Sequence, residues 1–277
     1  MVNNVNTNPG ALIALQNLTR VTESLEETQR RVSTGLEVSS AADNPALFSL
    51  AQRQRAELGS IESVQQGLRI GTSVVDVALA AGESVSDILV ELRALAVQAA
   101  DSSIAAEDRT LIQDQFQSLT AQIGRIIDSA DVGGRNLINN STPAGLSLVA
   151  GPDGATTISI AAQNLTIGGG ILSISADGSD LSTAAGAVTE IADIEASITA
   201  LSRSLGALGA GSQSLDLQNS ILTRVSDALE VSIGNLVDAD LARESSRLQA
   251  LQVQQQLAIQ SLSIANAAPN AVLALFA

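Results

Sequence analysis

The feature that most constrains the fold of this chain is a run of side chains that recur at alternating spacings of four and three residues near its start. A repeat of 3.5 residues places them on one side of a helix, which is the pattern of a coiled-coil seam. Two polar members, Thr22 and Gln29, weaken the seam and can fix its register. The seam consists of Ala11, Leu15, Leu18, Thr22, Leu25, Gln29, Val32 and Leu36.

The end of the chain repeats this pattern, and most of that segment carries no charge. The segment from Leu248 to Ala277 contains no Asp, Glu, Lys or Arg, but its glutamines interrupt every window long enough to cross a bilayer. We therefore predict no membrane span there. Pro269 is expected to end the helix. The predicted seam runs through Leu241, Glu244, Leu248, Leu251, Gln255, Ala258, Leu262 and Ala265.

A second apolar stripe, through Val253, Leu257, Ile259 and Ile264, lies away from this seam. A helix that is apolar on more than one face is buried from more than one side. The first charged residue of the chain is Arg20, so both ends lack charge, and charge is costly at a dry contact. These ends predict contacts between copies of the chain, and head-to-tail contacts build a ring or an open helical filament.

Between the ends, apolar spacing predicts long helices over most of 43–140 and over 186–237. Asp43 or Asn44 can cap the first of these helices, with Pro45 at its first position. Short alternating runs within 141–185 predict one or two β-hairpins, with a turn at Pro152 to Gly154. The expected fold class is mainly α: a long helical coiled-coil bundle formed by the N- and C-terminal segments, with a small central β-hairpin region.

Composition excludes several classes of function. The chain has no Cys, His, Trp, Tyr or Lys, and its net charge is -15. Without Cys and His the usual zinc, iron–sulfur and haem ligands are missing, as are thiol nucleophiles and serine–histidine triads. We expect no cofactor, no metal and no enzyme activity. The negative charge and 1% aromatic content disfavour nucleic acid and anionic membrane surfaces as partners.

Some charged residues leave two interpretations open. Asp238 and Asp240 could form a catalytic or calcium-binding pair, but capping of the last helix is favoured. A further group could pair between copies or lie on a solvated helix face. This group comprises Arg30, Arg31, Arg53, Arg55 and Glu57.

Two long stretches of sequence are similar to a known family. ALIALQNLTRVTESLEETQRRVSTGLEVSS, continuing to Asp101, resembles the N-terminal region of bacterial flagellins, and LGALGAGSQSLDLQNSILTRVSDALE, continuing to Phe276, resembles their C-terminal region. The chain is most similar to the short alphaproteobacterial flagellins, which lack outer variable domains. The resemblance implies that 1–42 and 238–277 form the coiled coil of a filament core. It assigns 43–140 and 186–237 to a rod layer, with the hairpin region at 141–185.

The implied function is that of a structural subunit that polymerises into the bacterial flagellar filament for swimming motility, with termini that become ordered on assembly. The implied partners are further copies, alone or together with similar flagellins, and an export chaperone, the filament cap and hook-junction proteins. No cleaved secretory signal is expected, and the resemblance implies type III export to an extracellular filament. The expected assembly and core residues are Leu15, Leu18, Leu25, Val32, Leu36, Leu241, Leu248, Leu251, Leu257, Leu262 and Phe276.

The resemblance also implies two peripheral sites. Glu91 stands four residues before the sequence LAVQ, where members that activate the vertebrate innate receptor carry an arginine, so we expect weak receptor activation. The loop VSSAADNPALFSLA likewise departs from the NSAKDDAAGLAI of many members. Hairpin hydroxyls in similar proteins are sometimes O-glycosylated. The corresponding candidates are Ser141, Thr142, Thr156, Thr157 and Thr166.

Two alternatives to a filament subunit remain at this point. A flagellar hook–filament junction protein is similar at both ends but usually has a larger middle. A helical protein that binds a lipid or granule surface would use the same apolar stripes at an interface. Lipid binding predicts helix gained on vesicles, whereas polymerisation predicts fibres.

Overall fold

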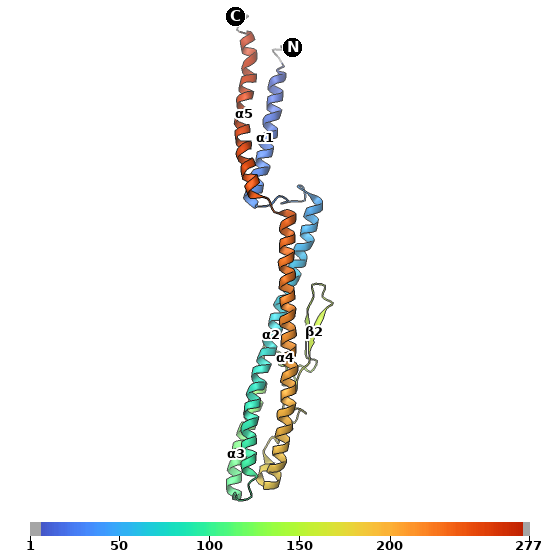
Figure 1. The fold of residues 1–277 in the computed structure, drawn as a ribbon, viewed down its shortest axis with the longest axis vertical. Helices are drawn as coiled ribbons and strands as arrows, with labels where there is room; N and C mark the ends of the chain where they lie inside the picture. Colours follow the sequence, from blue (N-terminus) through green and yellow to red (C-terminus); the bar gives the residue numbers. More distant parts are fainter. Residues whose placement is uncertain (1–6, 274–277) are drawn as a thin grey trace. The chain divides into compact units, whose positions relative to one another are not determined.

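The computed structural model describes residues 7–273, and most of them are helical (Figure 1). The mainly α fold with a small hairpin is confirmed. The helices are α1 (Pro9–Thr34), α2 (Pro45–Ala99), α3 (Ala106–Ser129), α4 (Ala184–Val237) and α5 (Leu241–Leu273), with a 3-10 turn η1 (Ser179–Ser182) and two strands, β1 (Leu146–Val149) and β2 (Thr157–Ile160).

The chain forms two compact units. The terminal unit is Met1–Ala56 with Ala228–Ala277, and the central unit is Glu57–Asp227. The units divide inside α2 and α4, whereas the sequence analysis placed the boundaries between 42 and 43 and between 237 and 238. Each long helix therefore contributes to both units.

The central unit has an aliphatic core built on antiparallel helices. On α4, one leucine or isoleucine every seven residues is buried, and the polar pairs Gln65 with Thr223 and Asp76 with Ser212 lie along the contact with α2. A repeat of seven is the coiled-coil period, so the sequence spacing places these α4 residues on one buried face. The α4 series consists of Ile194, Leu201, Leu208, Leu215 and Leu222.

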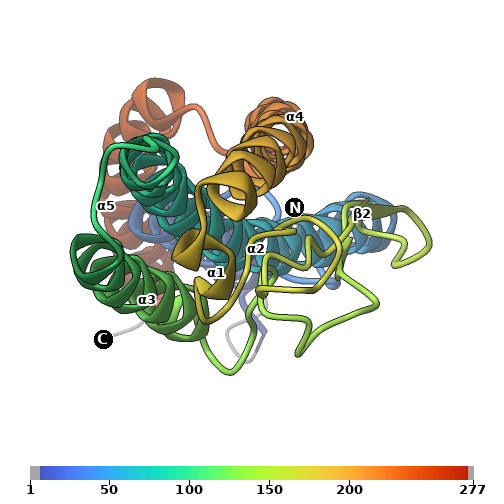
Figure 2. The ribbon, with the colours of Figure 1, turned by 90° about the horizontal axis from the view of Figure 1, so that it is seen from below.

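The hairpin packs on these helices through glycine positions. β1 and β2 are antiparallel, with Leu146 opposite Ile160, and Figure 2 shows the hairpin to one side of the helices. Leu148 lies over Gly71, where a Cβ would overlap it, and Ile160 lies 3.1 Å from the Cβ position of Gly211. Only one hairpin forms in the described residues. The other alternating runs, LTI and ILSISA, form no strand and meet in an isolated bridge.

The prediction that Pro269 ends the last helix is wrong. α5 continues to Leu273. A proline lacks the N–H that a helix donates to the carbonyl four residues earlier, here that of Ala265. That carbonyl instead accepts a hydrogen bond of 2.7 Å from Nδ2 of Asn8, at the start of α1.

Two glycines with positive φ give a test of the hairpin. Gly145→Ala should destabilise the central unit more than Gly154→Ala, by at least about 1 kcal/mol beyond the left-handed cost of roughly 1–2 kcal/mol common to both. Both residues have φ above +70°, but a Cβ on Gly145 would overlap the backbone carbonyl of Ile160, while nothing lies near that of Gly154. Urea unfolding measures the difference, and equal losses would contradict this packing.

Candidate assembly interface

The two ends of the chain pair as antiparallel helices. α1 and α5 lie side by side (Figure 1), and polar contacts join Asn8 to Ala265, Thr22 to Gln255 and Arg31 to Glu244. The residues buried between them are small or polar on α1, namely Ala14 and Thr28. Most other residues of α1 stay half-buried or exposed, so this pairing alone completes little of their burial.

The contact line on α1 departs from the predicted seam at two positions. Ala14 and Thr28 lie at its centre, whereas Leu15 is 49% exposed and Gln29 is exposed. Ala14 and Thr28 are separated by a whole number of 3.5-residue periods, so the observed line keeps the predicted repeat but passes one residue before Leu15 and Gln29. The other predicted positions on α1 are half-buried, as is Leu36, which follows the end of the helix at Thr34. On α1 they are Ala11, Leu18, Thr22, Leu25 and Val32.

On α5 the predicted seam faces α1 for most of its length. Leu251 is buried, Leu248 and Leu262 are half-buried, and Leu241 is exposed. Phe276, the last of the expected assembly residues, lies outside the described residues.

A carboxylate is buried at the inner end of this seam, near the connecting segments. Glu244 is 7% exposed, and its Oε1 lies 3.5 Å from Nη1 of Arg31. Arg31 also pairs with Glu27 at 2.6 Å. A buried carboxylate requires such a partner, because removing the arginine would leave an uncompensated charge. Arg30 also makes an ion pair within the chain, with Asp43.

The two segments that connect the terminal helices to α2 and α4 are hydrogen-bonded to each other. The amides of Glu37 and Val38 donate to the carbonyl of Val237 at 2.7 and 3.2 Å, and the amide of Ala239 donates to the carbonyl of Gly35. Gly35 ends α1 in the left-handed conformation, which glycine adopts without steric cost. These bonds hold the inner ends of α1 and α5 together.

The alternatives for the α2 cap are resolved. The Asn44 side chain caps α2 by accepting from the amide of Leu47, at 3.1 Å. Asp43 instead organises the preceding loop, because one of its oxygens accepts from the amides and hydroxyls of both Ser39 and Ser40, and Arg30 binds the other. The hydrogen bond from the Ser39 hydroxyl, followed by that from the Ser40 amide, lowers the pKa of Asp43 below its ordinary value.

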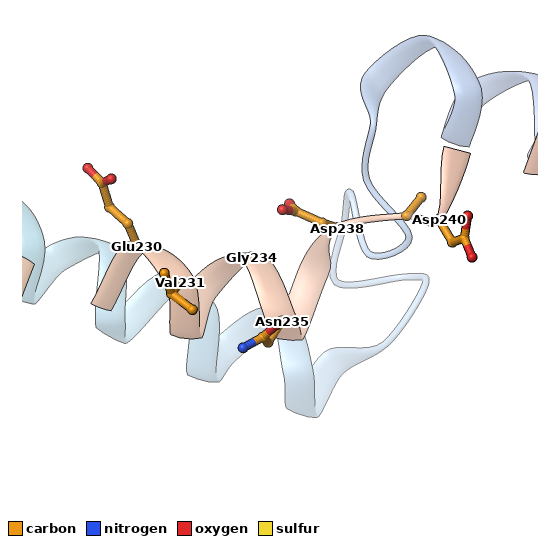
Figure 3. Close-up of a pocket in the computed structure, with 7 residues that line it drawn as sticks. Glu230, Val231, Gly234, Asn235, Asp238 and Asp240 are labelled. Atoms are coloured by element: carbon orange, nitrogen blue, oxygen red, sulfur yellow. The ribbon is translucent and has the colours of Figure 1, made fainter. Parts of the chain in front are cut away.

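An open depression of about 560 Å³ lies beside the start of α5, lined by Glu230, Asp238 and Asp240 among others (Figure 3). Asp240 caps α5, accepting from the amides of Ala242 and Arg243 at 3.1 Å each. Figure 3 shows the three carboxylates turned in different directions. Within residues 7–273 no group of acidic side chains is arranged to hold a metal ion.

The outer faces of the paired helices carry large apolar side chains. On α5, Val253 is 56% exposed, Leu257 63% and Ile264 67%, and Leu12 and Ile13 are exposed on α1. None of the helices in the described part of the chain is long and apolar enough to span a membrane. These faces are suited to packing against another apolar helix.

The remaining predicted sites lie on the central unit. Glu91 is exposed on α2, one turn before the buried Leu95. Among the hairpin hydroxyls, Ser141, Thr156 and Thr157 are exposed and Thr142 is half-buried, while the hydroxyl of Thr166 donates to Asn164. Modification of these hydroxyls stays a prediction.

Asn8 was not among the predicted site residues. Asn followed by Pro9 is a signal for the start of a helix, and the Asn8 side chain does cap α1 by accepting from the amide of Ala11. Its second contact, with Ala265, joins residues 257 positions apart. No local sequence signal reports such a contact.

The terminal helices are paired and carry exposed apolar faces, and they are joined to a separately packed central unit. This is the arrangement of a self-assembling structural subunit. Comparison with known proteins defines the family. The bacterial flagellin N-terminal helical region matches residues 5–142, and the bacterial flagellin C-terminal helical region matches residues 191–276. The chain belongs to the bacterial flagellins, the structural subunits that polymerise into the flagellar filament.

Full-length relatives agree with this family. Flagellin FljO of Caulobacter vibrioides is 39% identical over 275 residues, covering 99% of both chains, and a flagellin of Brucella melitensis is 33% identical, covering 98% of both. A solved structure described as a flagellar hook-associated protein of Vibrio parahaemolyticus has a TM-score of 0.57 and 15% identity, covering 71% of this chain and all of that one. The last likeness shows the fold alone.

The Asp43 loop predicts a pH dependence. Because the folded pKa lies below the ordinary value of 3.8, the stabilisation of the loop is present above that value and is lost as the pH falls through the folded pKa. In an NMR titration the amide signals of Ser39 and Ser40 should move together with the Asp43 carboxyl signal, with a midpoint below 3.8. In Asp43→Asn they should show no such step. A midpoint at or above the ordinary value would contradict the assignment.

Proposed function

We propose that the exposed apolar faces of α1 and α5 are the surfaces through which copies of this chain contact one another in the flagellar filament. The observation that carries the proposal is the outer stripe of α5, whose Val253, Leu257 and Ile264 are more than half exposed. The stripe lies in a segment that has no charged residue from Leu248 onwards. Charged groups would be costly to bury there, and their absence fits a dry contact.

The outer stripe has the spacing of a second coiled-coil seam. Its members alternate by four and three residues, and all are exposed in the single chain. A repeat of 3.5 is the requirement for packing against another helix. This favours a helix of a second copy over a flat lipid surface, which demands only a wide apolar face. The stripe consists of Ser246, Ala250, Val253, Leu257, Gln260, Ile264 and Ala267.

The energetics also favour assembly. Full burial of a Val, Leu or Ile side chain stabilises by about 1.5–3 kcal/mol, so completing the burial of three half-exposed ones contributes on the order of 3–5 kcal/mol for each contact. Within one chain the pairing of α1 with α5 leaves these three side chains more than half exposed, so it does not supply this stabilisation. The same contact repeated head-to-tail gives an open polymer.

Leu257 provides the test of this surface. Leu257→Asn should raise the critical concentration for growth on wild-type filament seeds at least about tenfold, since it removes roughly 1–2 kcal/mol of apolar burial and also places an amide in a dry contact. Leu111→Asn on α3 is the matched control, because Leu111 is 67% exposed in the central unit. Electron microscopy and sedimentation measure filament growth.

Two outcomes would reject the surface. Normal growth of Leu257→Asn would show that the stripe is not a contact between copies. Vesicle binding that requires Leu257, without filaments, would favour the lipid-surface alternative instead. The hook–filament junction alternative has less support, since the full-length relatives above are flagellins.

The finer partners are also part of the proposal. An export chaperone, the filament cap, hook-junction proteins and type III export to the cell exterior are expected of a flagellin, and membership of the family supports them. Co-purification of the chain with its chaperone from cells that lack the filament cap would test the chaperone. All four of these expectations stay predictions.

We also infer that Glu91 weakens activation of the vertebrate innate receptor. Its carboxylate stands on the exposed face of α2, where receptor-active members of the family carry an arginine. A reversed charge at a recognition contact is repulsive. Glu91→Arg should therefore raise the receptor response in a reporter assay about tenfold or more.

Glu62→Arg is the matched control, because Glu62 is an exposed acid on the same helix, away from LAVQ. A strong response to the unchanged chain, or an equal rise with both variants, would reject the role of Glu91.

A further inference from the structure

The outer part of α5, toward its C-terminus, contains a carbonyl that its own helix cannot satisfy. Each helix carbonyl accepts from the N–H four residues later, and for Ala265 that residue is Pro269, which has no N–H. The helix nevertheless continues to Leu273. A buried or half-buried carbonyl without a donor is costly, so another group must replace the missing N–H.

Asn8 supplies that donor with the NH2 group of its side-chain amide, whose oxygen already caps α1. Its Oδ1 accepts from the amide of Ala11 at 3.1 Å and caps α1, while its Nδ2 donates to the carbonyl of Ala265 at 2.7 Å. A primary amide has both a donor and an acceptor group, so one side chain can make both bonds. Serine, threonine and aspartate cap helices as well, but a carboxylate cannot donate.

We propose that Asn8 and Pro269 form a matched pair. Pro269 leaves one carbonyl open in the interior of α5, and Asn8, as a positioning residue, fills it and fastens the outer ends of the two terminal helices. The inner ends are already held by the connecting segments and by the Arg31–Glu244 pair. Every other interior carbonyl of α5 can accept from the N–H four residues later, because no other residue there is a proline. The free carbonyl of Ala265 therefore specifies where the start of α1 aligns along α5.

The consequence for assembly rests on the proposed function. A groove of about 430 Å³ lies beside this contact, formed by both helices. Fastening the outer ends keeps Leu12 and Leu15 next to Leu262, so that a second copy meets one composite apolar surface in place of two separate helices. The groove is lined by Thr7, Asn8, Ala11, Leu12, Leu15, Leu262 and Asn266.

The discriminating variant is Asn8→Asp. Aspartate caps a helix as well as asparagine and favours the positive end of its dipole, so a residue that only caps α1 would give unchanged or better growth. A residue that fastens α5 loses its donor and places a carboxylate against the Ala265 carbonyl. We expect the critical concentration for growth on wild-type seeds to rise about fivefold or more, the effect of losing one hydrogen bond.

Pro269→Ala tests whether the two residues act together. Alanine restores the N–H to the Ala265 carbonyl, so Asn8 becomes redundant there and Asn8→Asp should cost less than about twofold in that background. A cost that is the same with proline and with alanine at 269 would overturn the proposal. So would growth of Asn8→Asp at the wild-type critical concentration.

The wild type, Asn8→Asp, Pro269→Ala and the double variant can also be compared without filaments. In urea unfolding followed by far-UV circular dichroism, Asn8→Asp should lower the midpoint only when residue 269 is proline. If the unchanged chain forms no filaments, the proposed function fails, and this measurement still decides the matched pair. Midpoints that are equal in all four chains would overturn it.

Discussion

The proposed assembly surface of this flagellin depends on the antiparallel pairing of its first and last helices. The pairing brings together residues that are as far apart in sequence as Asn8 and Ala265. Among the described residues of α1, the small Ala14 and the polar Thr28 are buried in the seam, and on α5 Leu251 is buried. The outer faces of both helices keep large aliphatic side chains exposed, such as Leu12 and Ile13 on α1 and Leu257 and Ile264 on α5.

The two units of the chain differ in how far they bury their apolar side chains. In the central unit the leucines of α4 are buried within the chain, and the hairpin covers the helices through close contacts at Gly71 and Gly211. In the terminal unit Leu257 and Ile264 have no covering element within the described residues. A segment that cannot complete its burial alone is stabilised by whatever binds its folded form, which links its order to assembly.

Polar contacts determine how the terminal helices meet. A periodic seam of small apolar residues could shift by one repeat at little cost, whereas a polar or charged pair is satisfied in one register only. The Arg31–Glu244 pair and the Thr22–Gln255 contact are such pairs, and the connecting segments add backbone hydrogen bonds at the inner end. In this unit the polar contacts therefore specify the register, while much of the apolar surface of both helices stays uncovered within one chain.

The sequence by itself determined the helices, the hairpin turn and the uncharged apolar stripe of α5, because each follows from local spacing or residue chemistry. It narrowed the caps of α2 and α5 to two residues each, and the structure chose Asn44 and Asp240. Only the tertiary structure decided that Ala14, and not Leu15, faces α5, since a contact line depends on the partner helix. It also decided that α5 passes through Pro269, because the donor that replaces the missing N–H comes from the opposite end of the chain.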